Sequence, residues 1–334
     1  MRTTVLVPSG IRLPLLGLGC WSFGGQEGDY WGPHDDREAA EIIARALAHG
    51  ANYFDTAEGY NDGRSEEALG RALKGRRGEA IIGTKISPQN TEPKTLRRHC
   101  EASLRRLGTD VIDIYMVHWP ITDYPVADAF GALADLRAEG KIRAIGVSNF
   151  GVQQLQEALA TGAAIEVNQL GYSLLHRAIE FEILPLCRQR GVAVTAYMPL
   201  MQGLLTGRWR SADEIPPIRR RTRHFSSARP GTRHGEPGAE EEVFAAINGI
   251  ARLADELGMP MADLALAWVA AQEGVATVIA GTRTVAQLED SLRGIGRQLS
   301  ADVLAELDRL TQPVKAKLGA NADLWQSGAD SRIR

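Results

Sequence analysis

Eight short runs of β-branched and apolar residues recur along the chain, and seven of them are followed directly by a longer segment with the apolar spacing of a helix. This alternation is typical of βα units that share one parallel sheet. The expected strands cover residues 15–20, 52–57, 80–85, 112–118, 142–148, 165–170, 192–197 and 276–281. Eight such units close most economically as a (β/α)8 TIM barrel, whose usual length of about 250 residues leaves room for additions in a chain of 334.

We predict a single domain over residues 1–334 with several additions to the barrel. The additions are an N-terminal β-hairpin at 1–14, an inserted loop at 203–238, helices at 239–257, 260–272 and 301–310, and an irregular C-terminal tail at 312–334. The hairpin precedes the first barrel strand, so we expect it to plug one end of the barrel. A doubly wound sheet is disfavoured, because the only Gly-rich turn has Ser22 where a dinucleotide fingerprint needs its third glycine.

Charge and cysteine content restrict the partners and the compartment. Lys and Arg total 38 against 41 Asp and Glu, a net charge of −3, which gives no basic field for nucleic acid or an anionic membrane. Three scattered cysteines do not form a disulfide framework, and no apolar run approaches the roughly 18 residues of a membrane span. We therefore expect a cytoplasmic protein with a small-molecule partner; the sequence does not indicate an oligomeric state.

Polar residues stand at the ends of three successive expected strands. Asp55 lies near the end of the second strand, Lys85 ends the third and His118 ends the fourth, while Tyr60 follows Asp55 in the adjoining loop. Active-site groups of a TIM barrel project from the carboxyl ends of its strands, and neighbouring strands lie about 4.8 Å apart. We therefore expect the four side chains to converge on one patch.

Their chemistry is complementary. A free tyrosine has a pKa near 10 and is a poor proton donor at neutral pH, so we expect the Lys85 ammonium to lower the pKa of Tyr60. Asp55 supplies the counter-charge that a buried lysine needs. His118 then remains free to hydrogen-bond a substrate oxygen.

Each residue also has a simpler interpretation. Asp55 could pair with an interior lysine for structure alone, Lys85 could form a Schiff base, and His118 could be a satisfied core histidine. Their joint placement at three strand ends favours the functional interpretation. A metal site is not expected, because a lysine beside Asp55 and His118 would repel a dication and no H-x-x-x-H spacing appears.

Five segments together resemble the aldo-keto reductase family. They are Asn-Tyr-Phe-Asp-Thr-Ala-Glu-Gly-Tyr at 52–60, Gly-Thr-Lys at 83–85, Asp-Ile-Tyr-Met-Val-His-Trp at 113–119, Gly-Val-Ser-Asn-Phe at 146–150 and Val-Asn-Gln at 167–169. The segments occur in family order, and the hairpin, the late helices and the tail are also similar to the family. The resemblance implies NADPH-dependent reduction of aldehydes or ketones, with Tyr60 as general acid, Lys85 and Asp55 tuning it, and His118 orienting the carbonyl.

The resemblance also implies a cofactor site. It assigns Ser148, Asn149 and Gln169 to the nicotinamide carboxamide and Tyr197 to stacking on the ring, although Asn149 could instead cap a helix that starts near Phe150. The remaining expected cofactor residues are Pro199, Leu200, Gln202, Gly203 and Leu204 for the pyrophosphate, and Gly281, Thr282, Arg283 and Gln287 around the ribose 2′-phosphate. Ser291 stands where many relatives have an asparagine that contacts the adenine. This departure from the family pattern affects the expected adenine contact and the expected preference for NADPH over NADH.

Two further features surround the expected site. Trp21, Tyr30, Trp31 and Trp119 lie in strand-end loops and are expected to line a substrate pocket, with Trp325 in the tail as a further candidate, which favours hydrophobic or flat carbonyl compounds. Residues 208–233 contain eight arginines, which we interpret as a lid over the cofactor in preference to a partner-binding surface, the usual alternative being a solvated loop.

The leading hypothesis is an NADPH-dependent carbonyl reductase. The alternative is a nucleotide-binding regulatory subunit resembling potassium-channel β subunits, which can retain the same four residues. The absence of an N-terminal extension favours the enzyme.

Overall fold

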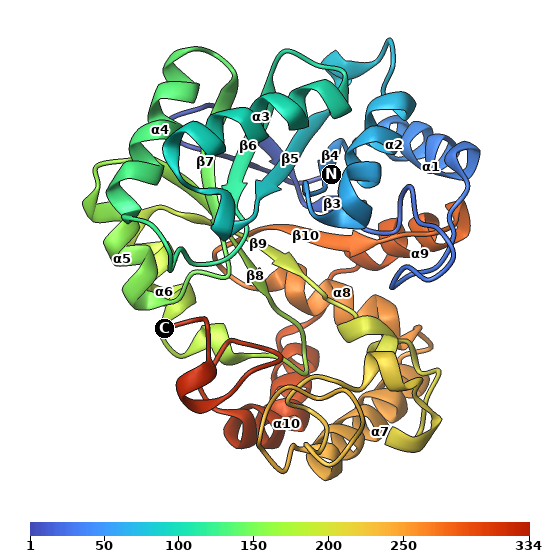
Figure 1. Cartoon of the computed structure of the whole chain (residues 1–334). Helices are drawn as coiled ribbons and strands as arrows, with labels where there is room; N and C mark the ends of the chain where they lie inside the picture. Colours follow the sequence, from blue (N-terminus) through green and yellow to red (C-terminus); the bar gives the residue numbers. More distant parts are fainter.

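The eight expected strands form a closed parallel barrel in the computed structural model, which describes residues 1–334 (Figure 1). The strands are β3 (Leu16–Gly19), β4 (Tyr53–Asp55), β5 (Ile81–Ile86), β6 (Ile112–Val117), β7 (Ile142–Ser148), β8 (Ile165–Gly171), β9 (Ala193–Tyr197) and β10 (Val275–Gly281). They follow one another around the barrel in chain order, and β10 closes it against β3. The (β/α)8 prediction is confirmed.

Eight helices surround the barrel, and two more lie outside that repeat. The surrounding helices are α1 (Asp36–Ala48), α2 (Arg64–Ala72), α3 (Pro93–Leu107), α4 (Val126–Ala138), α5 (Val152–Ala160), α6 (Ile183–Arg190), α8 (Met261–Ala271) and α9 (Val285–Ile295). The additional helices α7 (Glu240–Glu256) and α10 (Ala301–Leu318) pack against each other beside the barrel (Figure 1). None of the helices combines the length and the apolar character needed to cross a bilayer.

The ends of α1 and α3 show why these segments are helical. The side chain of Asp35 caps α1 by accepting from Arg37 N at 2.7 Å. The Glu92 side chain caps α3 by accepting from Thr95 N at 2.8 Å, ahead of Pro93 in the first turn. Both caps satisfy backbone donors that a helix leaves free at its start.

The N-terminal hairpin closes one end of the barrel. It consists of β1 (Thr3–Val5) and β2 (Arg12–Pro14), which pair antiparallel within the expected range 1–14. Leu6, Ile11 and Leu13 are buried in a separate apolar cluster with interior residues of the barrel strands. The hairpin therefore acts as the expected plug.

Glycines on two strands make room for one large interior side chain. Tyr53 on β4 is fully buried, and a Cβ built on Gly17 or on Gly83 would lie 2.6 or 2.5 Å from its side-chain atoms. Neither glycine can be enlarged without moving this ring.

Helix α10 extends further than expected. The predicted end at residue 310 is wrong: the helix continues through Pro313 to Leu318, so the irregular tail begins near residue 319 rather than 312. Proline removes one backbone hydrogen bond and disfavours a helix interior. Burial of Val314 and Leu318 on the same face offsets this cost.

The inserted loop and the tail are joined through Arg223. Its Nη1 and Nη2 donate to the carbonyls of Asn321 and Leu318, each at 2.8 Å, and its Nε donates to Glu236 at 2.9 Å. Its backbone N–H also donates to Leu324 O at 2.8 Å. The two segments therefore fold as one layer beside the barrel.

Two buried histidines at this junction predict acid sensitivity. Burial, with the neighbouring His224 and Arg223, lowers the pKa of His176 to about 3, and burial lowers the pKa of His224 to about 4. In the unfolded chain both imidazoles bind a proton when the pH falls below about 6.5, whereas in the folded protein they stay neutral. The free energy of unfolding therefore falls as the pH falls below that value. We expect each histidine to lower it by about 2 kcal/mol at pH 5 relative to pH 8.

Urea unfolding at both pH values measures this dependence. The variant His176→Gln is expected to lose less stability than the wild type between pH 8 and pH 5, by about 2 kcal/mol. An unchanged difference would show that His176 is not held neutral in the folded protein.

Candidate active site

Asp55 and Lys85 form a buried ion pair at the carboxyl ends of β4 and β5. Lys85 Nζ lies 2.8 and 2.9 Å from the two carboxylate oxygens of Asp55, and it donates to the Thr56 carbonyl at 2.7 Å. From the other side of the barrel, Gln169 Nε2 donates to Asp55 Oδ1 at 2.7 Å. Lys85 is 0% exposed and Asp55 3% exposed, so each charge depends on the other.

Tyr60 reaches this pair from the turn after β4. Its Oη lies 3.4 Å from Lys85 Nζ, which stands 4.8 Å from the centroid of the tyrosine ring. The ammonium thus has three neighbours: the Asp55 carboxylate, a backbone carbonyl and the phenol oxygen. Because Lys85 donates a hydrogen bond to that oxygen, the O–H of the phenol is free to donate to another acceptor.

The residue after Tyr60 ties this turn to the loop that follows β3. Asn61 adopts a left-handed conformation with φ 50°, and its Nδ2 donates to the carbonyls of Trp21 and Phe23, both at 2.9 Å. The Trp21 ring stacks on the Tyr60 ring, with centroids 5.5 Å apart. The position of Tyr60 is therefore fixed from both sides.

Burial governs the ionisation of Tyr60. It raises the pKa of Tyr60 well above the ordinary value, and the charges of Asp55 and Cys20 raise it further. The expected lowering of this pKa by Lys85 is wrong, because burial of the hydroxyl raises it. The pKa of Lys85 is itself lowered by burial, against the opposing effect of Asp55. The phenol therefore keeps its proton at neutral pH.

His118 lies against Tyr60 with its ring nitrogens free. The two ring centroids are 5.6 Å apart at an angle of 75°, and neither ring nitrogen of His118 has a hydrogen-bond partner. Burial and the charge of Lys85 lower the pKa of His118 well below its ordinary value. The imidazole is neutral and carries one N–H that can donate to an oxygen placed between the two rings.

Polar side chains continue this site along β7, β8 and β9. Asn149 Nδ2 donates to the His118 carbonyl and to Ser148 Oγ, both at 3.1 Å, and Tyr197 Oη donates to Asn149 Oδ1 at 2.7 Å. The interpretation of Asn149 as a helix cap is wrong, since α5 starts at Val152. Gln169 uses its amide nitrogen on Asp55, so its oxygen is the part left for a ligand.

The loop after β9 has a backbone suited to an anion. Met201, Gln202 and Gly203 are successive left-handed residues with φ 45°, 54° and 96°. The N–H groups of Met201 and Gly203 donate within the loop, to the carbonyls of Met198 and Leu200, both at 2.9 Å, so the N–H of Gln202 is the one of the three left for an anion. Among the other residues expected here, Pro199 and Leu204 are buried and Leu200 is half-buried. Their side chains are apolar and Pro199 has no N–H, so only the backbone N–H groups of Leu200 and Leu204 could donate to an anion.

A second polar feature lies between β10 and α9. Gly281 ends the strand and is exposed, while Thr282 is buried and its hydroxyl has no hydrogen-bond partner. Thr284 caps α9 by accepting from Gln287 N at 3.2 Å. An unpartnered hydroxyl beside a helix N-terminus fits a phosphate ligand.

Arg283 and its neighbours are engaged within the protein. The Arg283 guanidinium donates to the carbonyls of Trp31 and Pro33, and its backbone N–H donates to Gln287 Oε1 at 2.9 Å. Arg283 thus connects the loop after β3 to the start of α9. The Ser291 hydroxyl donates to the Gln287 carbonyl at 2.9 Å, so it bonds its own helix rather than pointing into the site.

Three of the five expected pocket aromatics gather on the Tyr60 side of the site. Trp21 stacks between Tyr60 and Tyr30, and Trp31 contacts both Trp21 and Tyr30 edge-on. Tyr30 Oη donates to Gln202 at 3.0 Å, which joins this group to the loop after β9. Trp119 lies apart from these rings, against Trp325 of the tail at a centroid distance of 6.0 Å.

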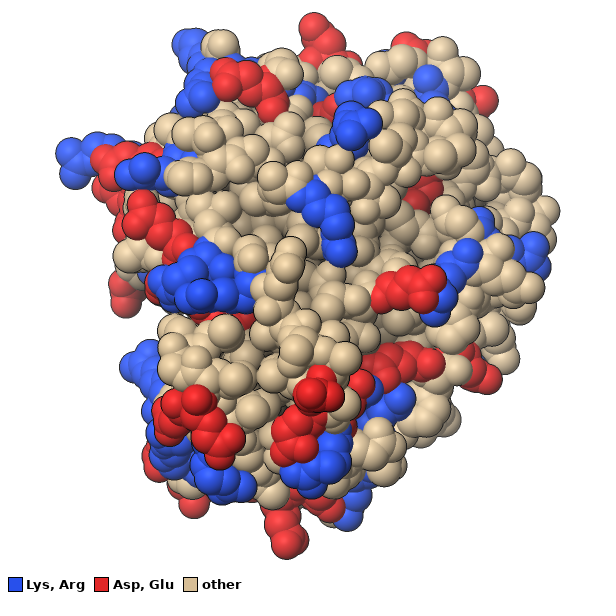
Figure 2. All heavy atoms as spheres, turned by 180° about the vertical axis from the view of Figure 1, so that it is seen from behind, with Lys and Arg blue, Asp and Glu red and all other residues tan.

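The Arg-rich stretch is folded against the body of the protein. Arg229 pairs with Asp213 and Glu240, and Arg223 is buried in the contacts with the tail. Arg219 lies over the rings of Trp31 and Trp209, at 5.2 and 5.7 Å. On the face shown in Figure 2, basic and acidic side chains are interspersed, and neither sign covers a continuous area.

Sequence reasoning missed the residues that hold the site together. Asn61 could have been noticed, because Asn-Asp-Gly directly after Tyr60 is a turn signal. The contact of Arg332 with Trp119 has no local signal, since it joins the tail to the end of β6.

Comparison with known proteins agrees with this geometry. The model of the Aldo/keto reductase family matches residues 15–312. An NADH-specific methylglyoxal reductase of Escherichia coli is 33% identical over 90% of this chain and 95% of its own length, and a probable voltage-gated potassium channel subunit beta of Arabidopsis thaliana is 29% identical over 95% and 98%. An aldo/keto reductase of Klebsiella pneumoniae, crystallised with NADP and acetate, is 31% identical with a TM-score of 0.74 over 94% and 96%.

Three observations agree: the barrel is closed, the family match covers nearly the whole chain, and four polar residues gather at the carboxyl end of the barrel. These residues are Asp55, Tyr60, Lys85 and His118. The chain belongs to the Aldo/keto reductase family and is an oxidoreductase.

Proposed function

We propose that this protein reduces aldehydes or ketones to alcohols with NADPH, using Tyr60 as the general acid. The observation that carries the proposal is the contact of Tyr60 Oη with Lys85 Nζ, itself paired with Asp55, beside a neutral His118. In this group, only Tyr60 both keeps a proton that it can transfer and lies next to the free N–H of His118.

The proton path follows from these contacts. When bound, the nicotinamide supplies a hydride to the carbonyl carbon. His118 holds the carbonyl oxygen by donating its N–H, and Tyr60 transfers its phenol proton to that oxygen as negative charge develops there. Lys85 donates to the Tyr60 oxygen and so stabilises the phenolate that remains. Asp55 and Gln169 keep the ammonium in position.

The residues present fit a dinucleotide phosphate. The N–H of Gln202, within the left-handed run at 201–203, is left for the pyrophosphate. The unpartnered Thr282 hydroxyl at the start of α9 suits the 2′-phosphate, and Arg283 follows it directly in the chain. Asn149 and Gln169 carry the amide groups that a carboxamide needs, and the Tyr197 ring is available for stacking. The NADP-bound Klebsiella relative supports NADPH, whereas the name of the Escherichia coli relative makes NADH the competing choice.

Steady-state oxidation of NADPH tests the activity. We expect turnover with methylglyoxal or with simple aliphatic and aromatic aldehydes, followed as loss of the reduced cofactor and appearance of the alcohol. No turnover with a broad carbonyl panel and either cofactor would contradict the proposal.

Arg283→Gln tests the cofactor choice. A hydrogen bond to a charged group contributes about 1.5–3 kcal/mol, so we expect the Kd for NADPH to rise about 10- to 100-fold and the Kd for NADH to change little. Equilibrium binding followed by the fluorescence of the bound nicotinamide measures both. Because Arg283 also holds the loop at Trp31, an equal loss for both cofactors would assign it a structural role only. Arg293→Gln on the same helix, which pairs with Asp263 and Asp290, is the matched control.

The second candidate function is that of a nucleotide-binding regulatory subunit. The similarity to the probable potassium channel subunit beta favours it. A protein of this kind would bind NADPH with little or no turnover of carbonyl compounds, so the same assay separates the two functions.

A further inference from the structure

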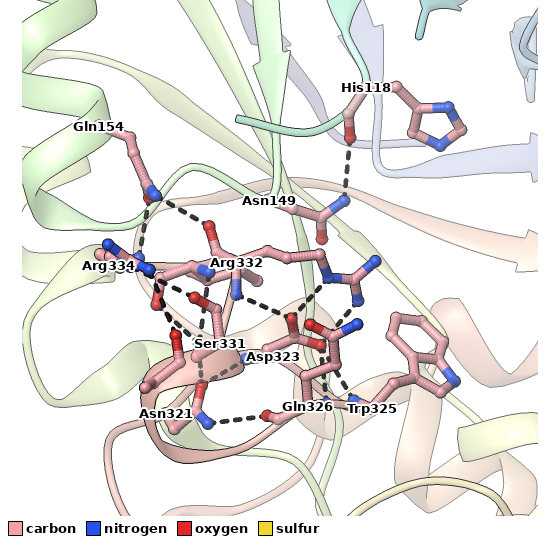
Figure 3. A network of polar contacts seen from close by, with 12 residues as sticks. His118, Asn149, Gln154, Asn321, Asp323, Trp325, Gln326, Ser331, Arg332 and Arg334 are labelled. Atoms are coloured by element: carbon pink, nitrogen blue, oxygen red, sulfur yellow. Dashed lines mark hydrogen bonds and ion pairs between the residues drawn. The ribbon is translucent and has the colours of Figure 1, made fainter. Parts of the chain in front are cut away.

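The C-terminal tail places a guanidinium on the residue that follows His118. The Cζ atom of Arg332 lies 3.6 Å from the centroid of the Trp119 ring, and it lies 5.8 Å from that of Trp325. Two aromatic faces thus hold one arginine at the carboxyl end of β6. Figure 3 shows the Arg332 side chain crossing the tail toward the side on which Asn149 and His118 lie.

Asp323 fixes the orientation of this guanidinium. Its side chain is fully buried, and its two oxygens accept from Arg332 Nε and Nη2, both at 2.8 Å. The Asp323 carboxylate also accepts from the backbone N–H groups of Trp325 and Arg332, at 3.0 and 3.2 Å. One edge of Arg332 is therefore held by a bidentate ion pair, which is a rigid arrangement.

The opposite edge of Arg332 is free. Nη1 has no hydrogen-bond partner, and the side chain is 34% exposed. In Arg223, which bonds the tail from the inserted loop, Nε, Nη1 and Nη2 all have protein partners. A purely structural role for Arg332 would not require an aligned but unused pair of N–H donors beside the site.

Arg332 also lies within electrostatic reach of the proposed nicotinamide position. Burial raises the pKa of Tyr197, the negative charge of Asp323 adds to that effect and the positive charge of Arg332 opposes it. The Tyr197 hydroxyl bonds Asn149, whose amide bonds the His118 carbonyl. A chain of contacts thus connects the surroundings of Arg332 with Tyr197, Asn149 and His118.

We propose that the free edge of Arg332 binds a carboxylate of the substrate, so that the preferred substrates are short aldehydes or ketones that carry a carboxylate a few bonds from the carbonyl group. Trp119 and Trp325 cover the carbon chain between the two groups. This proposal rests on the proposed function, because it assigns the substrate class of that same site.

A matched pair of substrates tests this assignment. 4-Oxobutanoate and its methyl ester present the same aldehyde and differ in the charge at the far end. We expect the wild type to have a kcat/KM at least about tenfold higher for the acid, the equivalent of one charged contact of about 1.4 kcal/mol. Arg332→Gln is expected to reduce this preference about tenfold, through a higher KM for the acid and an unchanged KM for the ester.

Two further variants separate charge from folding. Arg332→Lys keeps the charge and is expected to retain part of the preference, less than the wild type because it lacks the planar fork. Arg334→Gln is the matched control, since the Arg334 side chain bonds only the carbonyls of Ser331 and Ala329 within the tail and should leave the preference unchanged.

Three outcomes would overturn the proposal: no wild-type preference for the acid, a preference that survives Arg332→Gln, or equal losses for acid and ester, which would show that Arg332 only holds the tail. If the wild type turns over neither substrate, the proposed function fails instead. Quenching of tryptophan fluorescence by 4-hydroxybutanoate, in the presence of NADP, then tests carboxylate binding directly. The wild type should bind and Arg332→Gln should not, and equal binding by both would refute the assignment.

Discussion

Tyr60→Phe is expected to lower the rate of carbonyl reduction by about 10²- to 10⁴-fold, the range that a positioned general acid contributes. The substitution removes only the hydroxyl that lies 3.4 Å from Lys85 Nζ, and the ring can still stack on Trp21. Cofactor affinity and stability should therefore stay close to those of the wild type. Single-turnover reduction with saturating cofactor measures the chemical step without interference from product release.

Tyr115→Phe is the matched control for this experiment. Tyr115 is fully buried on β6, and its hydroxyl has no hydrogen-bond partner, so the change deletes the same atom outside the site. We expect the control to retain full activity. Retained activity in Tyr60→Phe would assign the proton to another donor, and equal losses in both variants would indicate a general effect of the substitution.

Lys85→Met is expected to destabilise the fold by about 3–5 kcal/mol and to abolish reduction. Stability is lost because the carboxylate of Asp55, which is only 3% exposed, is then a buried charge without its cation. The Gln169 amide still donates to this carboxylate but carries no compensating charge. The loss of activity arises because the Tyr60 oxygen loses the proton donor that stabilises its phenolate. Urea unfolding and the carbonyl assay measure the two effects separately.

The double variant Lys85→Met with Asp55→Asn distinguishes the two causes. Removing the charge of Asp55 as well should recover much of the stability, because no unpaired charge is then buried. Activity should not return, since the donor to Tyr60 is still missing. If Lys85→Met were as stable as the wild type, the pair would not be desolvated as its burial indicates.

The barrel was predictable because its strands and helices are written in local patterns. Runs such as 142–148 alternate with amphipathic helices, and each strand lies within about a residue or two of its expected range. The convergence of Asp55, Lys85 and His118 followed from barrel geometry alone, since carboxyl ends of neighbouring parallel strands meet at one rim.

The ionisation of Tyr60 was not predictable in the same way. The expected position of Lys85 beside Tyr60 at the strand ends suggested a lowered pKa, yet burial raises it. The balance between desolvation and a neighbouring charge depends on the packing around the hydroxyl, which residues from several strands and loops determine together. The end of α10 was misplaced for a related reason, because tertiary burial of Val314 and Leu318 outweighs the local effect of Pro313.

The sequence by itself determined the architecture, the order of the strands and the group of polar residues at their ends, because hydrophobic periodicity and strand-end position are local properties of a chain. Only the tertiary structure decided which side chains close over that group. Three contacts join segments that are distant in sequence: Asn61 bonds the loop after β3, Gln169 bonds Asp55, and Arg332 lies on Trp119. Such contacts depend on how loops and tail pack on the finished barrel, and no local pattern encodes that packing.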